Sequence, residues 1–273
     1  MDLATLLHSL PLLATLVKSA LPAAVGAGLS AGHWLAALPP CRNLSFETAT
    51  YLVCETDPKH FSIELFWKDE DGKLYQSLHN LRTAQQAAGR TMLFGINAGM
   101  YHPNLAPVGL YVEEGRQVTP AKTGSGSGNF SMQPNGIFYL SGGKAGVRAT
   151  RDFVKRPPRV DYATQSGPML VIDGKLHPKF QPDSASRKIR NGVGVRADGV
   201  AVFAISNDVV TFHEFARLFR DELGCPNALF LDGTISSLYA PAIGRNDDYW
   251  NLGPMIGVFR RWERPRIEPT GQK

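Results

Sequence analysis

Past residue 40, the chain is a series of short apolar or alternating runs bounded by turn residues, a pattern typical of β-strands. The clearest run, from Phe61 to Trp67, alternates apolar and polar side chains and leads into a turn at residues 69–72, as in a hairpin. Further strands are expected at residues 50–55, 91–96, 108–112, 136–140, 168–172, 192–196, 200–206, 228–231 and 255–259.

Two segments have the periodicity of helices. Residues 78–88 carry apolar side chains at helical spacing and end at Gly89, a common helix C-terminal residue. Thr211 and Glu214 form a capping-box pattern ahead of an apolar stripe that ends before Gly224. We therefore predict a single α+β domain over residues 41–262, with a curved mixed sheet, two principal helices and long glycine-rich loops. Residues 263–273 are predicted to be a flexible tail.

Composition narrows the class of protein. The chain has 273 residues, 43% of them hydrophobic and 19% charged, which excludes intrinsic disorder. Its formal net charge is +5, a modest and dispersed excess that is compatible with an anionic ligand. It lacks a clustered basic stripe and any nucleic-acid-binding motif, so no nucleic-acid partner is predicted.

The first 40 residues have the composition of an export leader. Asp2 and Lys18 are their only formally charged side chains, and small residues at 25–27 and 29–31 offer cleavage sites. Neither apolar run reaches the roughly 18 residues that a membrane span needs. We predict an exported, periplasmic protein whose only membrane contact is through this leader. The alternatives are a wrongly assigned start codon and an amphipathic helix packed on the domain.

Three cysteines fit an oxidising compartment. Cys41 and Cys54 bracket a predicted strand, and a disulfide between them would pin that strand to its neighbour. Cys225 follows a helix stop and precedes an apolar run, so we expect it to be buried. The spacing matches no zinc site.

Several well-known motifs are incomplete. His213-Glu214 lacks the second histidine of a metalloprotease, and the glycine-rich stretch 124–129 lacks the last glycine of a dinucleotide loop, so we interpret it as a mobile loop. No metal or cofactor is predicted, although a divalent cation stays open because Asp173, Asp208 and Asp232 carry suitable oxygen atoms.

Polar residues follow two predicted buried strands. Asp232 comes directly after residues 228–231, where desolvation would raise its carboxyl pKa and suit it to acid–base chemistry; the alternative is a cap or turn role. Asn97 follows residues 91–96 and is able to hydrogen-bond a sugar or a phosphate; the alternative is an Asx turn.

A cationic segment precedes another glycine-rich strand. Arg190 offers the bidentate geometry that suits a phosphate, whereas Lys188 is expected to be solvated. Ser166 stands at a strand entrance, and Asp173-Gly174 is expected to form a turn.

The ordered set of these segments resembles the phosphodiester glycosidase domain family, that of the uncovering enzyme, and most of all its bacterial exported branch. The segments are Asn97-Ala98-Gly99-Met100, Ser166-Gly167-Pro168-Met169-Leu170-Val171 with Asp173-Gly174, Arg190-Asn191-Gly192-Val193-Gly194-Val195, and Leu231-Asp232-Gly233 with Ser236. The resemblance implies an α+β fold in which Asn97, Arg190 and Asp232 converge. This chain departs from the family's Asp-Gly-Gly-Gly-Ser turn at residues 232–236.

The predicted function is hydrolysis, in the cell envelope, of the bond between a sugar anomeric carbon and a phosphodiester oxygen. Asp232 acts as base or nucleophile, Arg190 neutralises the departing phosphate, and Asn97 orients the substrate. The expected substrate contacts are Gly99, Tyr101, His102, Ser166, Gly167, Arg187, His213, Gly233 and Ser236. For Tyr101, His102 and His213, a structural role is an equal alternative. A second hypothesis is a non-catalytic module that binds small or polymeric phosphorylated saccharides and assists envelope or exopolysaccharide assembly.

Overall fold

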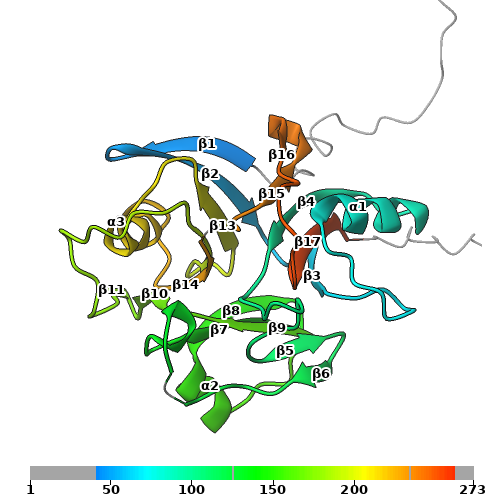
Figure 1. Cartoon of the computed structure of the whole chain (residues 1–273), viewed down its shortest axis with the longest axis horizontal. Helices are drawn as coiled ribbons and strands as arrows, with labels where there is room; N and C mark the ends of the chain where they lie inside the picture. The colour runs from blue at the N-terminus through cyan, green and yellow to red at the C-terminus, as the bar shows by residue number, and fades with distance from the viewer. Residues whose placement is uncertain (1–40, 125, 234, 262–273) are drawn as a thin grey trace, which may run out of the picture. The chain divides into compact units, whose positions relative to one another are not determined.

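Short connections between strands favour antiparallel pairing, and antiparallel pairing is what the chain adopts throughout. The computed structural model describes residues 41–124, 126–233 and 235–261. Its strands form three separate sheets, and every strand pair in them is antiparallel. The prediction of one curved mixed sheet was therefore wrong: the domain is mainly β, with three antiparallel sheets and few helices (Figure 1).

Sheet A has seven strands in the order β1-β2-β13-β12-β14-β10-β11. They are β1 (Cys41–Phe46), β2 (Ala49–Thr56), β13 (Ala201–Ser206), β12 (Asn191–Val195), β14 (Asn227–Asp232), β10 (Met169–Ile172) and β11 (Lys175–Leu176). The expected turn at Asp173-Gly174 joins β10 to β11, with both residues at positive φ.

Sheets B and C have five strands each. Sheet B has the order β16 (Arg245–Asn246), β15 (Leu238–Ala240), β4 (Met92–Asn97), β17 (Met255–Arg260) and β3 (Phe61–Phe66). Sheet C has the order β6 (Arg116–Thr119), β5 (Tyr111–Glu113), β9 (Tyr162–Ser166), β7 (Gly136–Ser141) and β8 (Lys144–Ala149).

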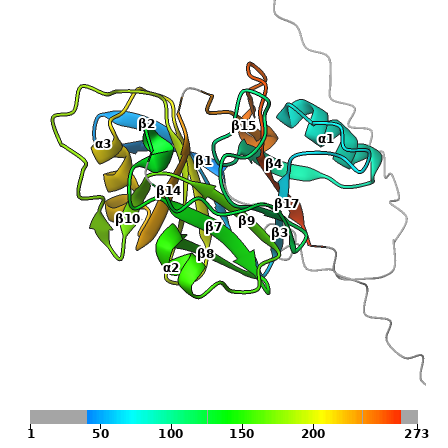
Figure 2. The ribbon, with the colours of Figure 1, turned by 60° about the horizontal axis from the view of Figure 1, so that its bottom comes forward.

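Each sheet packs against one short helix, and the two predicted helices are both present. Helix α1 (Leu78–Ala87) lies against sheet B, and α3 (Phe212–Arg217), extended by a π-helical turn over Leu218–Glu222, lies against sheet A. A third helix that we did not predict, α2 (Thr150–Lys155), covers sheet C. Figure 2 shows the three helices beside their own sheets. Two 3₁₀ turns, η3 (Asn129–Ser131) and η5 (Pro241–Ile243), lie in loops.

The period of two along β13 shows how the layers share their apolar residues. Ala201, Phe203 and Ile205 belong to a core to which all three sheets contribute. Val202 and Ala204, which point to the opposite face, belong to a second cluster beneath α3. The sheets therefore meet through their inner faces, while each outer face is covered by a helix.

Phe203 lies at the meeting point of the three sheets. Its ring, 1% exposed, makes edge-to-face contacts with Phe94 of sheet B at 5.5 Å and with Phe138 of sheet C at 5.8 Å between ring centroids. One side chain of sheet A thus contacts both other sheets.

The cysteine predictions are confirmed. Cys41 and Cys54 face each other across the β1–β2 pair and form a disulfide. Cys225 is buried, and burial raises its thiol pKa to about 12, so it packs as a small apolar residue.

Two expectations for single strands need correction. The turn at residues 69–72 forms, but the hairpin expected around it does not extend: the turn is flanked by a single β-bridge between Lys68 and Leu74. Strand β3 pairs with β17 instead. Strand β5 starts at Tyr111 rather than at residue 108, because the Val108 and Leu110 amides donate to Met100 and to the Gln165 side chain. The leader and the tail after residue 261 lie outside the described residues. In the described part of the chain, no helix is long and apolar enough to cross a membrane.

We expect Phe203→Ala to lower the free energy of unfolding by about 3–5 kcal/mol, since it leaves a cavity where three sheets meet. Native-state hydrogen exchange should accelerate in all three sheets. The control is Phe153→Ala, whose ring packs only between α2 and sheet C, and whose effect should stay within that layer. Acceleration confined to sheet A in Phe203→Ala would contradict the shared core.

Candidate active site

Strand ends from all three sheets meet at one place. Asn97 ends β4 of sheet B, Asn191 begins β12 and Asp232 ends β14 of sheet A, and Ser166 ends β9 of sheet C. Asn97, Asn191 and Ser166 are fully buried, whereas Asp232 is half-buried. Rigid strands thus bring Asn97 and Asp232, two of the predicted catalytic residues, into one polar cluster.

A hydrogen-bonded amide bridge joins Asn97 to Asp232. The Asn191 Nδ2 donates to Asn97 Oδ1 at 2.5 Å, and the backbone amide of Asp232 donates to Asn191 Oδ1 at 2.7 Å. Asn97 Oδ1 also accepts from the Ser237 amide at 2.9 Å. Because both acceptor directions of Asn97 Oδ1 are occupied, the group it has left to offer is the Nδ2 donor. This nitrogen is buried and has no partner among the described residues.

A β-bulge sets the position of Asp232. Asn191 pairs with Asp232, but the next residue, Gly192, pairs with Phe230, so Leu231 is the extra residue on β14. A bulge of this kind bends its strand and redirects the neighbouring side chains. Leu231 enters the shared core while Asp232 keeps partial access to solvent.

Burial raises the Asp232 carboxyl pKa to about 6, against the lowering effect of a hydrogen bond from the Gly233 amide at 2.5 Å. Tyr101 lies close enough to Asp232 for this carboxylate to raise the Tyr101 pKa further, after the larger effect of burial. The Tyr101 hydroxyl donates to the Asn251 carbonyl at 2.7 Å, and its ring covers Gly253. Tyr101 is therefore a neutral side chain held in one position by Asn251 and Gly253.

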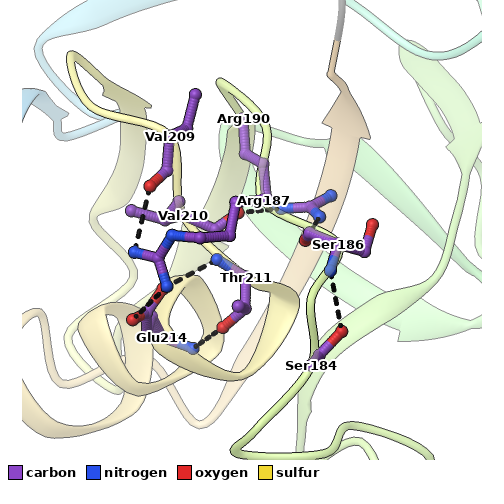
Figure 3. Close-up of polar contacts among 8 residues, drawn as sticks. All are labelled: Ser184, Ser186, Arg187, Arg190, Val209, Val210, Thr211 and Glu214. Atoms are coloured by element: carbon purple, nitrogen blue, oxygen red, sulfur yellow. Dashed lines mark hydrogen bonds and ion pairs between the residues drawn. The ribbon is translucent and has the colours of Figure 1, made fainter.

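The structure places the Arg190 side chain in the interior, among Val210, Ser186 and α3, rather than in an open site (Figure 3). Its side chain is 1% exposed, and its guanidinium donates to the Val210 carbonyl at 2.8 Å and the Ser186 carbonyl at 2.9 Å. The guanidinium also stacks on the Phe212 ring, 3.7 Å from its centroid. Burial lowers the Arg190 pKa to about 10, so the group stays charged at neutral pH. Its predicted contact with a phosphate stays a prediction, and the contacts observed hold the 186–190 loop on α3.

Arg187 and His213 lie at the N-terminal end of α3. Arg187 donates to Glu214 Oε1 at 3.0 Å and to the Val209 carbonyl at 3.1 Å (Figure 3). Glu214 completes the predicted capping box with Thr211. His213, on the first turn of α3, is half-buried. The described contacts of Arg187 are thus with protein groups.

Three of the predicted substrate contacts tie the backbone together. The Ser166 hydroxyl is buried and donates to the Leu231 carbonyl at 2.8 Å. A Cβ on Gly99 would lie 2.5 Å from the Gln165 carbonyl, and one on Gly167 would lie 2.8 Å from the Phe130 carbonyl. Gly99 allows the segment after β4 of sheet B to approach β9 of sheet C closely, and Gly167 does the same for the loop that carries η3.

The remaining predicted contacts lie in turns. His102 is exposed, in the tight loop between Tyr101 and Pro107. Gly233 is buried, and Ser236 closes its turn by donating to the Gly233 carbonyl at 2.7 Å.

The three aspartates considered as cation ligands lie apart from one another. Asp208 accepts two hydrogen bonds from Thr50, and Asp173 lies beside Asn227. Within the described ranges, no group of three or more His, Cys, Asp or Glu side chains is arranged to hold a metal ion.

Two buried amides, Asn191 and Gln165, were not among the predicted site residues. Asn191 stands in one of the ordered segments, directly after Arg190, whereas Gln165 lies one residue before the segment that begins at Ser166. In both cases the neighbouring residue has the more conspicuous chemistry. Gln165 is 1% exposed and accepts from the Leu110 and Lys122 amides at 3.0 and 2.9 Å. The sequence does hold one signal for both residues: each is a polar residue close to the start of an apolar strand.

The fold and site define a β-rich domain with a half-buried carboxyl group where three sheets meet. The phosphodiester glycosidase family model matches residues 90–259 of the chain. The Escherichia coli K12 protein YigE, itself uncharacterised, is 37% identical over 196 residues, which are 72% of this chain and 76% of YigE. The chain belongs to the phosphodiester glycosidase family, as its ordered motifs predicted.

Two solved structures share the fold. One is the zebrafish N-acetylglucosamine-1-phosphodiester alpha-N-acetylglucosaminidase catalytic domain, auto-inhibited by its pro-peptide. It has a TM-score of 0.54 and 14% identity, over 81% of this chain and 82% of that one. The other is a candidate exported protein of Burkholderia pseudomallei, with a TM-score of 0.50 and 12% identity, over 77% and 74% of the two chains. The disulfide of this chain is consistent with export.

We expect Asn191→Ala to lower the free energy of unfolding by about 2–4 kcal/mol, because it leaves the Asp232 amide without a partner and Asn97 Oδ1 with the Ser237 amide alone, in a buried site. The matched control is Asn227→Ala, which removes an amide from the exposed Asp173 turn and should cost less than about 1 kcal/mol. Urea unfolding measures both. Equal losses of unfolding free energy in the two variants would show that the buried amide bridge contributes no more to stability than the exposed turn.

The raised Asp232 pKa makes stability depend on pH. The carboxyl titrates near pH 4 when unfolded and near 6 when folded, so the folded state binds more protons between these values and loses stability as the pH rises through them. Asp232→Asn removes this penalty. We expect the variant to be more stable than the wild type by about 2 kcal/mol at pH 7.5, with the difference disappearing towards pH 4. If the wild type instead gained stability relative to Asp232→Asn as the pH rises from 4 to 7.5, the raised pKa of Asp232 would be contradicted.

Proposed function

We propose that the protein hydrolyses a sugar-1-phosphodiester, cleaving the bond between the anomeric carbon and the phosphodiester oxygen. The observation that carries this proposal is the Asp232 carboxyl, half-buried at the junction of three sheets with a pKa of about 6. Membership of the phosphodiester glycosidase family supports the choice of bond. A carboxyl kept at a cost to stability is typical of a catalytic acid or base.

Above pH 6, Asp232 is ionised and can serve in either of two ways. As a base, it takes a proton from the water whose oxygen bonds to the anomeric carbon while the carbon–oxygen bond to phosphate breaks. As a nucleophile, it bonds to the anomeric carbon itself, and water hydrolyses this intermediate in a second step. In both cases the products are a free sugar and a phosphate monoester, which leaves with the bonding electron pair.

Asn97 and Tyr101 are proposed to position the sugar. The Asn97 Nδ2 donor is held in one orientation by Asn191 and Ser237, and it is suited to an acceptor oxygen of a sugar hydroxyl or phosphate. Tyr101 offers a fixed ring, within the electrostatic influence of Asp232, on which a sugar can pack. Both groups are in place before substrate arrives, which lowers the ordering cost of binding.

Arg190 is proposed to contribute its charge from a fixed position. A direct contact with phosphate would require its guanidinium to leave the Val210 and Ser186 carbonyls and the Phe212 ring. A buried cation favours developing negative charge without moving, since low surrounding polarity strengthens its field. The proposed location is the cell envelope, which the Cys41–Cys54 disulfide and the similarity to a candidate exported protein support.

The test is release of free sugar from a panel of sugar-1-phosphodiesters by the full chain, with and without a chelator. We expect Asp232→Asn to lose at least about 10³-fold in kcat/KM, and wild-type kcat/KM to rise tenfold per pH unit up to about 6 and then level off. Asp173→Asn, a carboxylate in an exposed turn, is the control and should keep full activity.

The same assay separates the proposal from the binding-module hypothesis. Binding of the panel compounds by both wild type and Asp232→Asn, with no turnover by either, would identify a non-catalytic saccharide-binding module. The anomeric configuration of the released sugar distinguishes the two roles of Asp232: retention indicates the nucleophile, and inversion the base.

A further inference from the structure

A cavity of about 630 Å³ lies at the loop that precedes η3, and its volume is within the size range of small-molecule sites. Its apolar lining comes from Val108 and Phe130, and its polar lining from Lys122, Thr123, Ser127 and Ser131. We call it the Lys122 cavity. Gly124 and Gly126 of the glycine-rich stretch provide part of its wall.

The Lys122 cavity adjoins two segments of the candidate site. The Val108 amide donates to the Met100 carbonyl at 3.0 Å, which places Val108 across a hairpin from Tyr101. Phe130 lies against Gly167, the neighbour of Ser166, whose hydroxyl binds the Leu231 carbonyl just before Asp232. Two short series of contacts thus connect the lining of the cavity with the segments that carry Tyr101 and Asp232.

Lys122 is the one charged side chain among the described residues that line the cavity. With hydroxyl groups from Thr123, Ser127 and Ser131 around it, the lining supplies a positive charge and several hydrogen-bond donors. No described lining residue carries a carboxylate, so the cavity favours an anion that accepts several hydrogen bonds. Phosphate esters have this chemistry.

A buried amide fixes the position of Lys122. Gln165 Oε1 accepts from the Lys122 amide at 2.9 Å, and Gln165 Nε2 donates to the Lys122 carbonyl at 2.7 Å. The same amide accepts from Leu110 and donates to Thr150 Oγ1, so every part of it is engaged in the interior. A Cβ on Gly109 would lie 2.3 Å from Gln165 Oε1, so the glycine leaves room for this amide. The loop is thus anchored at Lys122 to Gln165 of β9. The next residue of β9, Ser166, is the one that binds the Leu231 carbonyl.

We propose that the Lys122 cavity binds the phosphate group of the substrate, with Lys122 as its cationic contact. This inference rests on the proposed function for the choice of phosphate as the anion. It also accounts for the burial of Arg190, since the charge that meets the phosphate comes from Lys122 while Arg190 keeps its place under α3.

The experiment compares Lys122→Gln with Lys155→Gln in the full chain. Lys155 is the matched control: it lines a different surface cavity of about 410 Å³ beside α2 and lies 3.9 Å from Asp152. Both substitutions remove one positive charge and neither side chain is buried, so equal melting temperatures are the first check. The readouts are kcat and KM on the phosphodiester panel, and the affinity for inorganic phosphate and for a sugar 1-phosphate by calorimetry.

We expect Lys122→Gln to raise KM about tenfold or more with kcat within about twofold, and to weaken phosphate binding to the same extent. Lys155→Gln should match the wild type in both readouts. If the wild type has no turnover, loss of sugar 1-phosphate binding in Lys122→Gln alone would support the subsite while the proposed function fails. Equal behaviour of the two variants, with or without turnover, would overturn the subsite.

Discussion

One shared apolar core holds the three sheets of this domain together, and most of its other features follow from that constraint. Because every strand of the shared core must send alternate residues inward, each sheet has an outer face that needs its own cover, and α1, α2 and α3 provide it. Phe203 shows the constraint in a single residue: it belongs to sheet A, yet its ring contacts Phe94 and Phe138 of the other two sheets. No sheet could be removed without exposing this core.

The same constraint explains why the site lies where it does. Where strands of three sheets end close together, their backbone groups leave the ladders and need other partners, since unpaired buried polar groups are costly. Asn191 and Asn97 satisfy these groups with side-chain amides, and the bulge at Leu231 lets β14 end with Asp232 at the edge of the cluster. The amides that satisfy the strand ends are also the groups that fix the orientation of Asn97 and the backbone of Asp232.

Two kinds of feature could be predicted from the sequence: helices whose ends are marked by capping residues, and polar residues that directly follow an apolar run. Helices α1 and α3 were marked by Gly89 and by the Thr211 capping box, and Asp232 by the apolar run that it ends. Strands β8 and β9 were missed because Gly146 and Gln165 interrupt the pattern, although both pack closely in the fold. Their pairing is set by distant partners, which a local pattern does not contain.

Arg190 shows a further limit of local reasoning. A cation before a glycine-rich strand resembles a phosphate ligand in sequence, and only the tertiary structure shows Phe212 and two carbonyls occupying its guanidinium. Lys122 is the converse case: nothing in its neighbourhood marked it, because its anchor, Gln165, lies 43 residues away.

The division of labour between strands and loops gives the domain both rigidity and adaptability. Asn97 and Asp232 stand on strands locked by the core, so a change in their geometry would have to disturb sheet pairing. The wall of the Lys122 cavity is instead a glycine-rich loop, fixed to the scaffold through the Gln165 amide. Substitutions in such a loop alter what is bound without altering the strand ends. A domain built on this plan can therefore keep the geometry of its strand ends while the lining of the cavity varies.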